Sequence, residues 1–179
     1  DIGNEVDRET KIINDLLSLV KMDKAAGDLN ITNININELL EQILKRLRPI
    51  AKQRNIDVLY ESAREVFAEI DEVKLTLAIS NLVENAIKYN KEYGYVKVSL
   101  DADHQFATIM GEDNGIGIPE EAQEHIFERF YRVDKSHSRE IGGTGLGLAI
   151  VRHVVAEHHA KLDIKSKEGK GTEIKVTFV

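Results

Sequence analysis

The stretch DNGIGIP, at residues 113–119, decides how this sequence is interpreted. It places a carboxylate and two glycines directly after a predicted strand at 106–110. Glycine lets the backbone bend closely around a bound group, and a carboxylate at the end of a strand can reach that group. An ordinary surface turn uses the same residue types. The stretch therefore indicates either a ligand-binding turn or a plain turn. The other motifs of the sequence are needed to distinguish these two alternatives.

A second glycine-rich stretch, GGTGLGL at residues 142–148, opens a helix predicted to run to His159. Unpaired backbone N–H groups and the helix dipole favour a phosphate at such a position. The stretch is not a Walker A loop, because no Gly-Lys-Ser/Thr ends it. It also lacks the spacing and the βαβ setting of a dinucleotide fold. The P-loop and Rossmann interpretations are therefore excluded.

Between these regions along the chain, a helix capped by Asp71 is predicted to run to about Tyr89. At about 100° per residue, Asn81, Asn85 and Lys88 share one face, and apolar residues occupy the other. The apolar residues are Leu75, Ile79, Leu82, Val83 and Ala86. In an isolated helix such a polar face would simply be solvated. It indicates a binding site only when it is considered together with the two glycine-rich stretches.

The remaining pattern predicts helices and strands that interleave without a regular βαβ repeat. Further helices are expected at 5–24 and at 119–127. Another helix is expected to begin at a capping box formed by Asn35 and Glu38 and to end at about 51, with Pro49 perturbing it. Strands are expected at 29–34, 56–60, 66–70, 96–100, 106–110, 162–166 and 172–178. We therefore predict an α+β fold, a two-layer sandwich whose mixed sheet is covered by helices on one face, with a bundle-type helix at the N-terminus.

Composition limits the possible functions. The chain has 179 residues, of which 42% are hydrophobic, which is enough for one domain and an appendage. Its longest apolar runs are only a few residues, so no membrane span is predicted. The absence of cysteine excludes a disulfide framework and any thiolate metal site, and it suits a cytoplasmic location. A net charge of −7 argues against binding to nucleic acid or to an anionic membrane.

In order and spacing, four segments resemble the motif set of the bacterial sensor histidine kinases, in the GHKL/Bergerat ATPase superfamily that also holds gyrase, Hsp90 and MutL. They are an N box at 81–90, a glycine box at 113–117, an F box at 127–130 and a second glycine box at 143–147. The resemblance covers about 35–179, and the first helix resembles the second helix of the family's dimerisation and phosphoacceptor bundle. It implies a bundle fragment at 1–26 and an ATP-binding catalytic domain at 27–179, with a mobile ATP lid at about 128–144.

The resemblance also implies a site for ATP and Mg²⁺. Asn85 would supply an oxygen to the metal, and Lys88 would contact the terminal phosphates. Asp113 would accept a hydrogen bond from the adenine amino group, which guanine replaces with a carbonyl, so ATP is expected rather than GTP. The implied ligand-binding residues are Asn81, Asn85, Lys88, Tyr89, Asp113, Gly115, Ile116, Gly117, Ile118, Gly143, Thr144, Gly145, Leu146, Gly147 and Leu148.

The implied catalytic residues are Asn85, Lys88 and Arg132. Arg132 lies in the basic lid, where it would stabilise the transferring phosphoryl group, although a solvated charged loop is the alternative. In the hydrolytic relatives, a glutamate one turn before the metal-binding asparagine activates water. This chain has Asn81 there, and an amide cannot take a proton at neutral pH. Transfer to a protein histidine is therefore expected instead of hydrolysis.

The family's acceptor histidine does not occur in a matching context, so we expect this piece to bind Mg·ATP without phosphorylating itself. The implied partners are the chain's own phosphoacceptor bundle, homodimeric in the intact protein, and a response regulator receiver domain. Two other interpretations stay open: a nucleotide-responsive interaction module, and a serine kinase of the anti-sigma type. The sequence also departs from the family at Met110 and Gly111, where alternating apolar residues are usual, so we expect a bulge near the adenine site.

Overall fold

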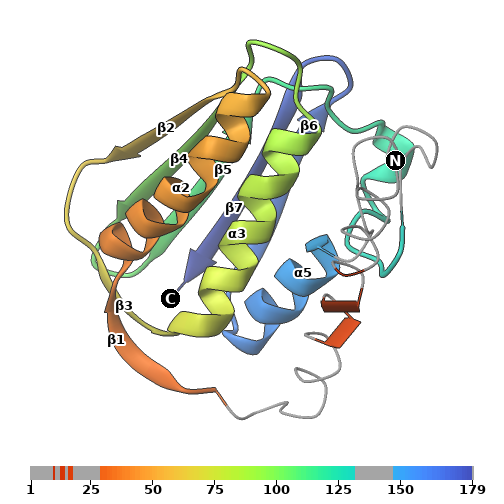
Figure 1. The fold of residues 1–179 in the computed structure, drawn as a ribbon. Helices are drawn as coiled ribbons and strands as arrows, with labels where there is room; N and C mark the ends of the chain where they lie inside the picture. Colours follow the sequence, from red (N-terminus) through yellow and green to blue (C-terminus); the bar gives the residue numbers. More distant parts are fainter. Residues whose placement is uncertain (1–9, 11–12, 15, 18–28, 132–146, 179) are drawn as a thin grey trace.

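The computed structural model describes residues 10, 13–14, 16–17, 29–131 and 147–178. The described residues of the N-terminal segment are helical, and the rest of the helix predicted at 5–24 lies outside the described part. Figure 1 shows the order of the elements. The helices are α2 (Ile36–Gln53), α3 (Glu72–Lys88), the 3₁₀ turn η1 (Glu120–Ala122) and α5 (Gly147–Glu157). The strands are β1 (Ile31–Asn35), β2 (Asp57–Ser62), β3 (Phe67–Asp71), β4 (Tyr95–Ala102), β5 (Ala107–Asp113), β6 (Lys161–Lys167) and β7 (Gly171–Phe178).

The main sheet has five strands in the order β2-β4-β5-β7-β6. The β2 strand runs parallel to β4, and the other neighbours are antiparallel, so the sheet is mixed as predicted. The β1 and β3 strands form a separate antiparallel pair. The consecutive strands β2 and β3 therefore join different sheets. The parallel β2–β4 pairing needs a long crossover, and the chain makes it through β3 and α3.

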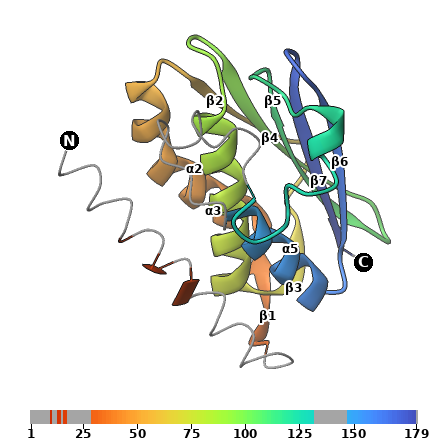
Figure 2. The same ribbon diagram turned by 90° about the vertical axis from the view of Figure 1, so that its right-hand side faces the viewer.

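The α2, α3 and α5 helices all cover the same face of the main sheet (Figure 2). Strand β4 shows the reason, because Val96, Val98 and Leu100 are buried while the residues between them are more exposed. On the opposite face, Lys97 forms an ion pair with Glu61 at 3.2 Å. One apolar and one polar sheet face produce the predicted two-layer sandwich, which is confirmed.

The helix boundaries follow local signals. The Asn35 side chain accepts a hydrogen bond from the Glu38 N–H at 3.2 Å, and Asp71 accepts one from the Lys74 N–H at 3.0 Å, so both predicted N-caps are confirmed. Pro49 does not end α2, which continues to Gln53. The helix predicted at 119–127 is wrong, because this segment contains only the single 3₁₀ turn η1 followed by further turns.

Strand β5 pairs without interruption with both neighbours from Ala107 to Asp113. The bulge expected at Met110 and Gly111 is therefore wrong, and Gly111 lies directly opposite Val98 and Ile174. A missing side chain does not disturb the backbone ladder of a strand that is paired on both sides. In the part of the chain that the structure describes, no helix has the length and apolar composition needed to cross a membrane.

Candidate functional site

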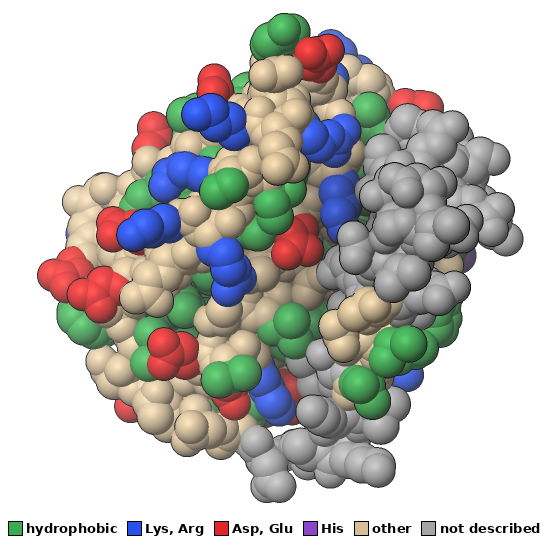
Figure 3. Space-filling view, in the orientation of Figure 1, with side chains coloured by type: hydrophobic (Ala, Val, Ile, Leu, Met, Phe, Trp, Pro, Cys, Tyr) green, Lys and Arg blue, Asp and Glu red, His purple; other side chains and the backbone are tan. Residues whose placement is uncertain are grey.

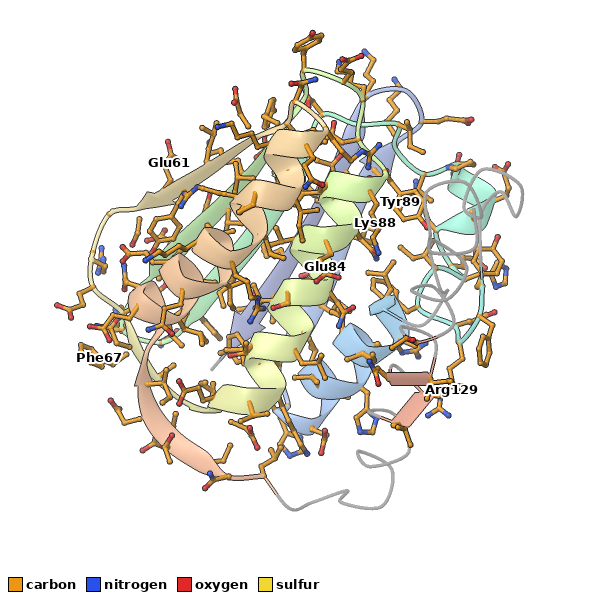
Figure 4. All side chains as sticks on the ribbon, in the orientation of Figure 1. Glu61, Phe67, Glu84, Lys88, Tyr89 and Arg129 are labelled. Carbon is orange, nitrogen blue, oxygen red and sulfur yellow. The ribbon has the colours of Figure 1, made fainter. Side chains whose placement is uncertain are left out.

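The polar face of α3 is present as predicted, but it is not simply solvated. Asn81 is only 6% exposed, and its side-chain amide donates a hydrogen bond to the Leu77 carbonyl oxygen at 2.9 Å. Asn85 and Lys88 are half-buried, one and two turns further along the helix. Figure 4 shows Lys88 and Tyr89 on the side of α3 that faces the segment after β5. This face therefore borders other parts of the protein.

The C-terminal end of α3 touches the first glycine stretch. The Ile116 N–H donates a hydrogen bond to the Tyr89 carbonyl oxygen at 3.1 Å. A Cβ atom added at Gly115 would lie 2.5 Å from that oxygen and 2.8 Å from the Asn90 Cα. A larger residue at position 115 would push the two segments apart. The glycine at 115 thus permits close contact between the end of α3 and the turn after β5.

Asp113 ends β5 beside this contact, and one of its carboxylate oxygens accepts a hydrogen bond from the Gly115 N–H at 2.9 Å. Burial raises the pKa of Asp113 to about 6, although the backbone N–H groups of Gly115 and Thr172 act in the opposite direction. Glu112 raises this pKa further by like-charge repulsion. The carboxylate is therefore charged at neutral pH while it is largely removed from water.

Gly147, from the second glycine stretch, reaches the other part of the polar face of α3. A Cβ atom at Gly147, the first residue of α5, would lie 3.0 Å from the Asn81 side-chain oxygen. Leu148 follows in a half-buried position. The turn after β5 and Gly147 thus approach the same helix, the turn near Tyr89 and Gly147 near Asn81.

Gly117 and Ile118 are held by the β6–β7 hairpin. Gly117 has a φ of 70°, and a Cβ atom there would overlap the Lys167 carbonyl oxygen. The Ile118 N–H donates a hydrogen bond to the Ser166 hydroxyl at 2.9 Å, and the Ile116 carbonyl oxygen accepts one from the Gly169 N–H at 2.7 Å. These contacts position the glycine stretch against the hairpin.

Several predicted site residues lie outside the described part of the chain. They are Arg132, Gly143, Thr144, Gly145 and Leu146, and most of the predicted lid at 128–144 lies there as well.

Arg54 is a residue of this region that the sequence did not indicate. Its guanidinium donates hydrogen bonds to the carbonyl oxygens of Ile87 at 2.8 Å and Lys88 at 2.6 Å. These carbonyls lie in the last turn of α3, where helical partners are missing and positive charge is favourable. Arg54 is more than 30 residues away along the chain, so no local pattern predicts the contact.

Charged side chains of both signs surround the site (Figure 3). On the helix-covered side, basic and acidic side chains are interspersed over α2 and α3 although the whole chain is acidic (Figure 3). A shallow, open cavity of about 380 Å³ is lined by residues of β5, β6 and β7, including Glu112, Asp113, Lys165 and Glu173. Strand alternation puts the side chains of Glu112, Lys165 and Glu173 on the sheet face away from the helices, whereas Asp113 faces the helices. The cavity therefore lies mainly on the face of the sheet away from the helices, and Asp113 at the end of β5 forms part of its lining.

Asn85 offers a neutral amide oxygen from the half-buried polar face of α3. Among the described residues, no group of three or more His, Asp or Glu side chains could hold a metal ion. An amide oxygen suits Mg²⁺, which keeps several waters and binds substrate phosphates. Asn85 thus fits a metal that is shared with a phosphorylated ligand.

The comparisons with known proteins agree with this arrangement. The chain is 38% identical over 178 residues to the sensor histidine kinase WalK of Bacillus subtilis, an alignment that covers 98% of this chain and 29% of that protein. The fold is similar to the catalytic domain of histidine kinase ThkA, with a TM-score of 0.73, 28% identity and coverage of 84% of this chain and 95% of that one. Full-length ShkA in complex with AMPPNP gives a TM-score of 0.84 at 26% identity, covering 97% of this chain and 36% of that one.

The chain thus spans less than a third of the length of the WalK relative. Residues 70–179, more than half of the chain, match one family model. That segment contains α3, the turn after β5 and α5, which together form the arrangement described above. The chain therefore belongs to the family of histidine kinase-, DNA gyrase B- and HSP90-like ATPases.

Proposed function

We propose that this chain is the catalytic part of a sensor histidine kinase, which binds Mg·ATP and transfers its γ-phosphoryl group to a histidine of the dimerisation domain. The observation that carries the proposal is that α3 is contacted at both ends of its polar face, by Ile116 at the Tyr89 carbonyl and by Gly147 at Asn81. The identity to a sensor histidine kinase over nearly the whole chain supports it.

Asp113 selects the base in this proposal. Its carboxylate is partly buried, so a hydrogen bond from an adenine amino group competes little with water. Guanine would turn a carbonyl oxygen toward it and leave two acceptors facing each other. Tyr89 packs beside the adenine, and Gly115, Ile116, Gly117 and Ile118 shape the turn around the base and ribose.

Lys88, Asn85 and the helix start at Gly147 bind the phosphate end of the nucleotide. Lys88 contributes positive charge, Asn85 holds Mg²⁺ through its amide oxygen, and α5 contributes the N-terminal end of its dipole. Gly143, Thr144, Gly145, Leu146 and Leu148 complete this part of the proposed site, and Arg132 contacts the transferring group from the lid. The bound metal supplies charge stabilisation to the phosphate oxygens.

Asn81 favours transfer over hydrolysis. Its side-chain amide donates to the Leu77 carbonyl, and an amide has no basic lone pair that could take a proton from water. In the proposed reaction, the bond between the γ-phosphorus and the leaving oxygen breaks, a bond to a histidine nitrogen forms, and ADP leaves.

The proposal places residues 1–26 in the second helix of the dimerisation domain and 27–179 in the catalytic domain, with the lid at about 128–144. The partners are the phosphoacceptor bundle of the homodimeric intact protein and the receiver domain of a response regulator. We place this part of the protein in the cytoplasm, where ATP is available.

Calorimetric titration tests the binding proposal. The wild-type chain is expected to bind ATP in preference to GTP, and Mg²⁺ is expected to raise the affinity for ATP. The Asp113→Asn variant should bind ATP about tenfold more weakly, because a charged hydrogen bond is lost. The Asn85→Ala variant should lose the effect of Mg²⁺ while it keeps the preference for adenine. Equal affinity of the wild type for ATP and GTP would contradict the proposed selection of adenine by Asp113.

A transfer assay tests the reaction. The chain is mixed with a separately supplied phosphoacceptor bundle and γ-labelled ATP, and label is expected on a histidine of the bundle. The phosphorylated product should be labile in acid, whereas phosphoserine is stable. Binding of ATP without transfer would instead support a nucleotide-responsive interaction module, and an acid-stable product would support a serine kinase.

A further inference from the structure

Gly111 lies in the middle of the central strand β5, on the face that carries Asp113. Side chains of a strand alternate between its two faces, so residues 111 and 113 point the same way. The cross-strand neighbours of Gly111 are Val98 and Ile174. Val98 is buried in the core under the helices, which identifies the face of Gly111 as the helix-covered one.

The space over Gly111 is open. Among the described residues, a Cβ atom added there would meet no heavy atom within 4 Å, whereas one added at Gly115 or Gly147 would be crowded by α3 or its C-terminal end. Gly111 and Ile174 are also only half-buried, although they lie on the helix-covered face of the sheet. A hollow with access from outside therefore lies over Gly111, one strand repeat of roughly 7 Å from Asp113.

Asp113 fixes where a bound base would meet this hollow. It stands at the end of β5, next to the turn that contacts Tyr89, and Gly111 lies deeper along the same strand. A base whose amino nitrogen donates to the Asp113 carboxylate directs that nitrogen toward the sheet. A substituent on the nitrogen would then enter the space that a side chain at position 111 would otherwise fill.

We propose that Gly111 is a specificity-determining residue, which allows the site to accept adenine nucleotides with a small apolar group on the exocyclic amino nitrogen. This inference rests on the proposed function, because it uses Asp113 as the partner of the base. A singly substituted amino group keeps one N–H for the Asp113 carboxylate. The substituent buries its apolar surface beside the half-buried Ile174 instead of clashing with a side chain.

Calorimetry with three nucleotides and two proteins tests the proposal. The nucleotides are ATP, ATP with an isopropyl group on its amino nitrogen (N⁶-isopropyl-ATP), and 2′-deoxy-ATP as a ligand altered far from Gly111. The wild type is expected to bind N⁶-isopropyl-ATP within about threefold of ATP, because the hollow accepts the group. The Gly111→Val variant should bind N⁶-isopropyl-ATP at least about tenfold more weakly, because its side chain fills the hollow.

The controls separate the pocket from the fold. The valine variant should bind ATP and 2′-deoxy-ATP with the same affinity ratio as the wild type. It should melt no lower than the wild type, since the added side chain enters open space and valine favours strands. The Gly111→Ala variant adds a single carbon that meets no atom in the described part of the chain, so it provides a folded intermediate step in the same series.

Two results would overturn the inference alone. One is a wild type that binds ATP but rejects N⁶-isopropyl-ATP by more than about tenfold. The other is a Gly111→Val variant that binds both nucleotides as the wild type does. A wild type that binds no ATP at all would overturn the proposed function, and this inference with it.

Discussion

Gly147 of α5 faces Asn81 of α3 so closely that a Cβ atom on Gly147 would lie 3.0 Å from the Asn81 side-chain oxygen. The two residues are 66 positions apart, and each belongs to a different predicted motif. Their contact brings the start of α5 onto the polar face of α3. The short separation also makes position 147 a sensitive place to test the proposed site.

The Gly147→Ala substitution should weaken nucleotide binding without unfolding the protein. Alanine favours a helix over glycine by up to about 1 kcal/mol, which offsets the cost of displacing the Asn81 side chain. The melting temperature should therefore change little, while the affinity for ATP falls several-fold because Asn81 moves. Thermal denaturation and calorimetry on the same samples measure both effects. An unchanged ATP affinity would show that Asn81 does not border the ligand.

The Gly117→Ala substitution should destabilise the fold itself. Residue 117 has a φ of 70°, and an added Cβ would overlap the Lys167 carbonyl oxygen, so the turn would have to leave the β6–β7 hairpin. We expect a loss of about 1–3 kcal/mol in the free energy of unfolding, measured by urea denaturation. Gly111→Ala is the matched control, because its Cβ meets no atom of the described residues within 4 Å. Equal stability of the two variants would contradict this account.

Asp113 should make both stability and nucleotide binding depend on pH. Its pKa rises from 3.8 to about 6 on folding, so the folded chain holds this proton more strongly than the unfolded chain does. The resulting contribution to stability is fully present below about pH 4 and is lost as the pH rises through about 6. The free energies of unfolding of the wild type and of Asp113→Asn should therefore be measured between pH 4 and 7. The difference between the two proteins should be smaller at pH 4 than at pH 7.

Binding should follow the opposite direction, because the charged carboxylate is the better acceptor. The affinity for ATP is expected to fall as the pH drops below about 6, the pKa of Asp113. Titration of the ATP phosphates affects the wild type and Asp113→Asn alike, so the ratio of their affinities isolates Asp113. A ratio that stays constant from pH 5 to 7 would contradict the assigned role.

Arg54 should stabilise the end of α3. Its removal in Arg54→Ala leaves the carbonyl oxygens of Ile87 and Lys88 without a charged donor, which costs about 1–3 kcal/mol of unfolding free energy. Arg54→Lys should recover part of this loss, and Arg48→Ala, at an exposed position of α2, should have little effect. Amide hydrogen exchange at Ile116, which donates to Tyr89, should be faster in Arg54→Ala. An unchanged exchange rate at the Ile116 amide would show that Arg54 does not stabilise the contact between α3 and the turn after β5.

Local signals account for the parts of this protein that the sequence predicted well. Asp71 caps α3, and the hydrophobic spacing of the helix leaves Asn81, Asn85 and Lys88 on one face. Such signals act over a few residues, so they can be recognised in the sequence. They also misled at 119–127, where η1 is one 3₁₀ turn and the predicted helix does not form.

Pairing between distant segments could not be predicted in the same way. The β2 strand pairs with β4 and β3 pairs with β1, although β2 and β3 are consecutive. Strand register depends on which faces are buried together, and alternation within one strand does not identify its partner. The same limit explains the missed contact of Arg54, whose acceptors are carbonyl oxygens that carry no sequence signature.

By itself, the amino-acid sequence determined the helix faces, the caps, the glycine turns and the family resemblance, since each depends on residue types at short spacing. Only the tertiary structure decided that Gly115 meets Tyr89, that Gly147 meets Asn81, and that the space over Gly111 is open. These relationships arise when separate elements bury their apolar faces on one sheet, and the distances between residues far apart in sequence follow from that packing.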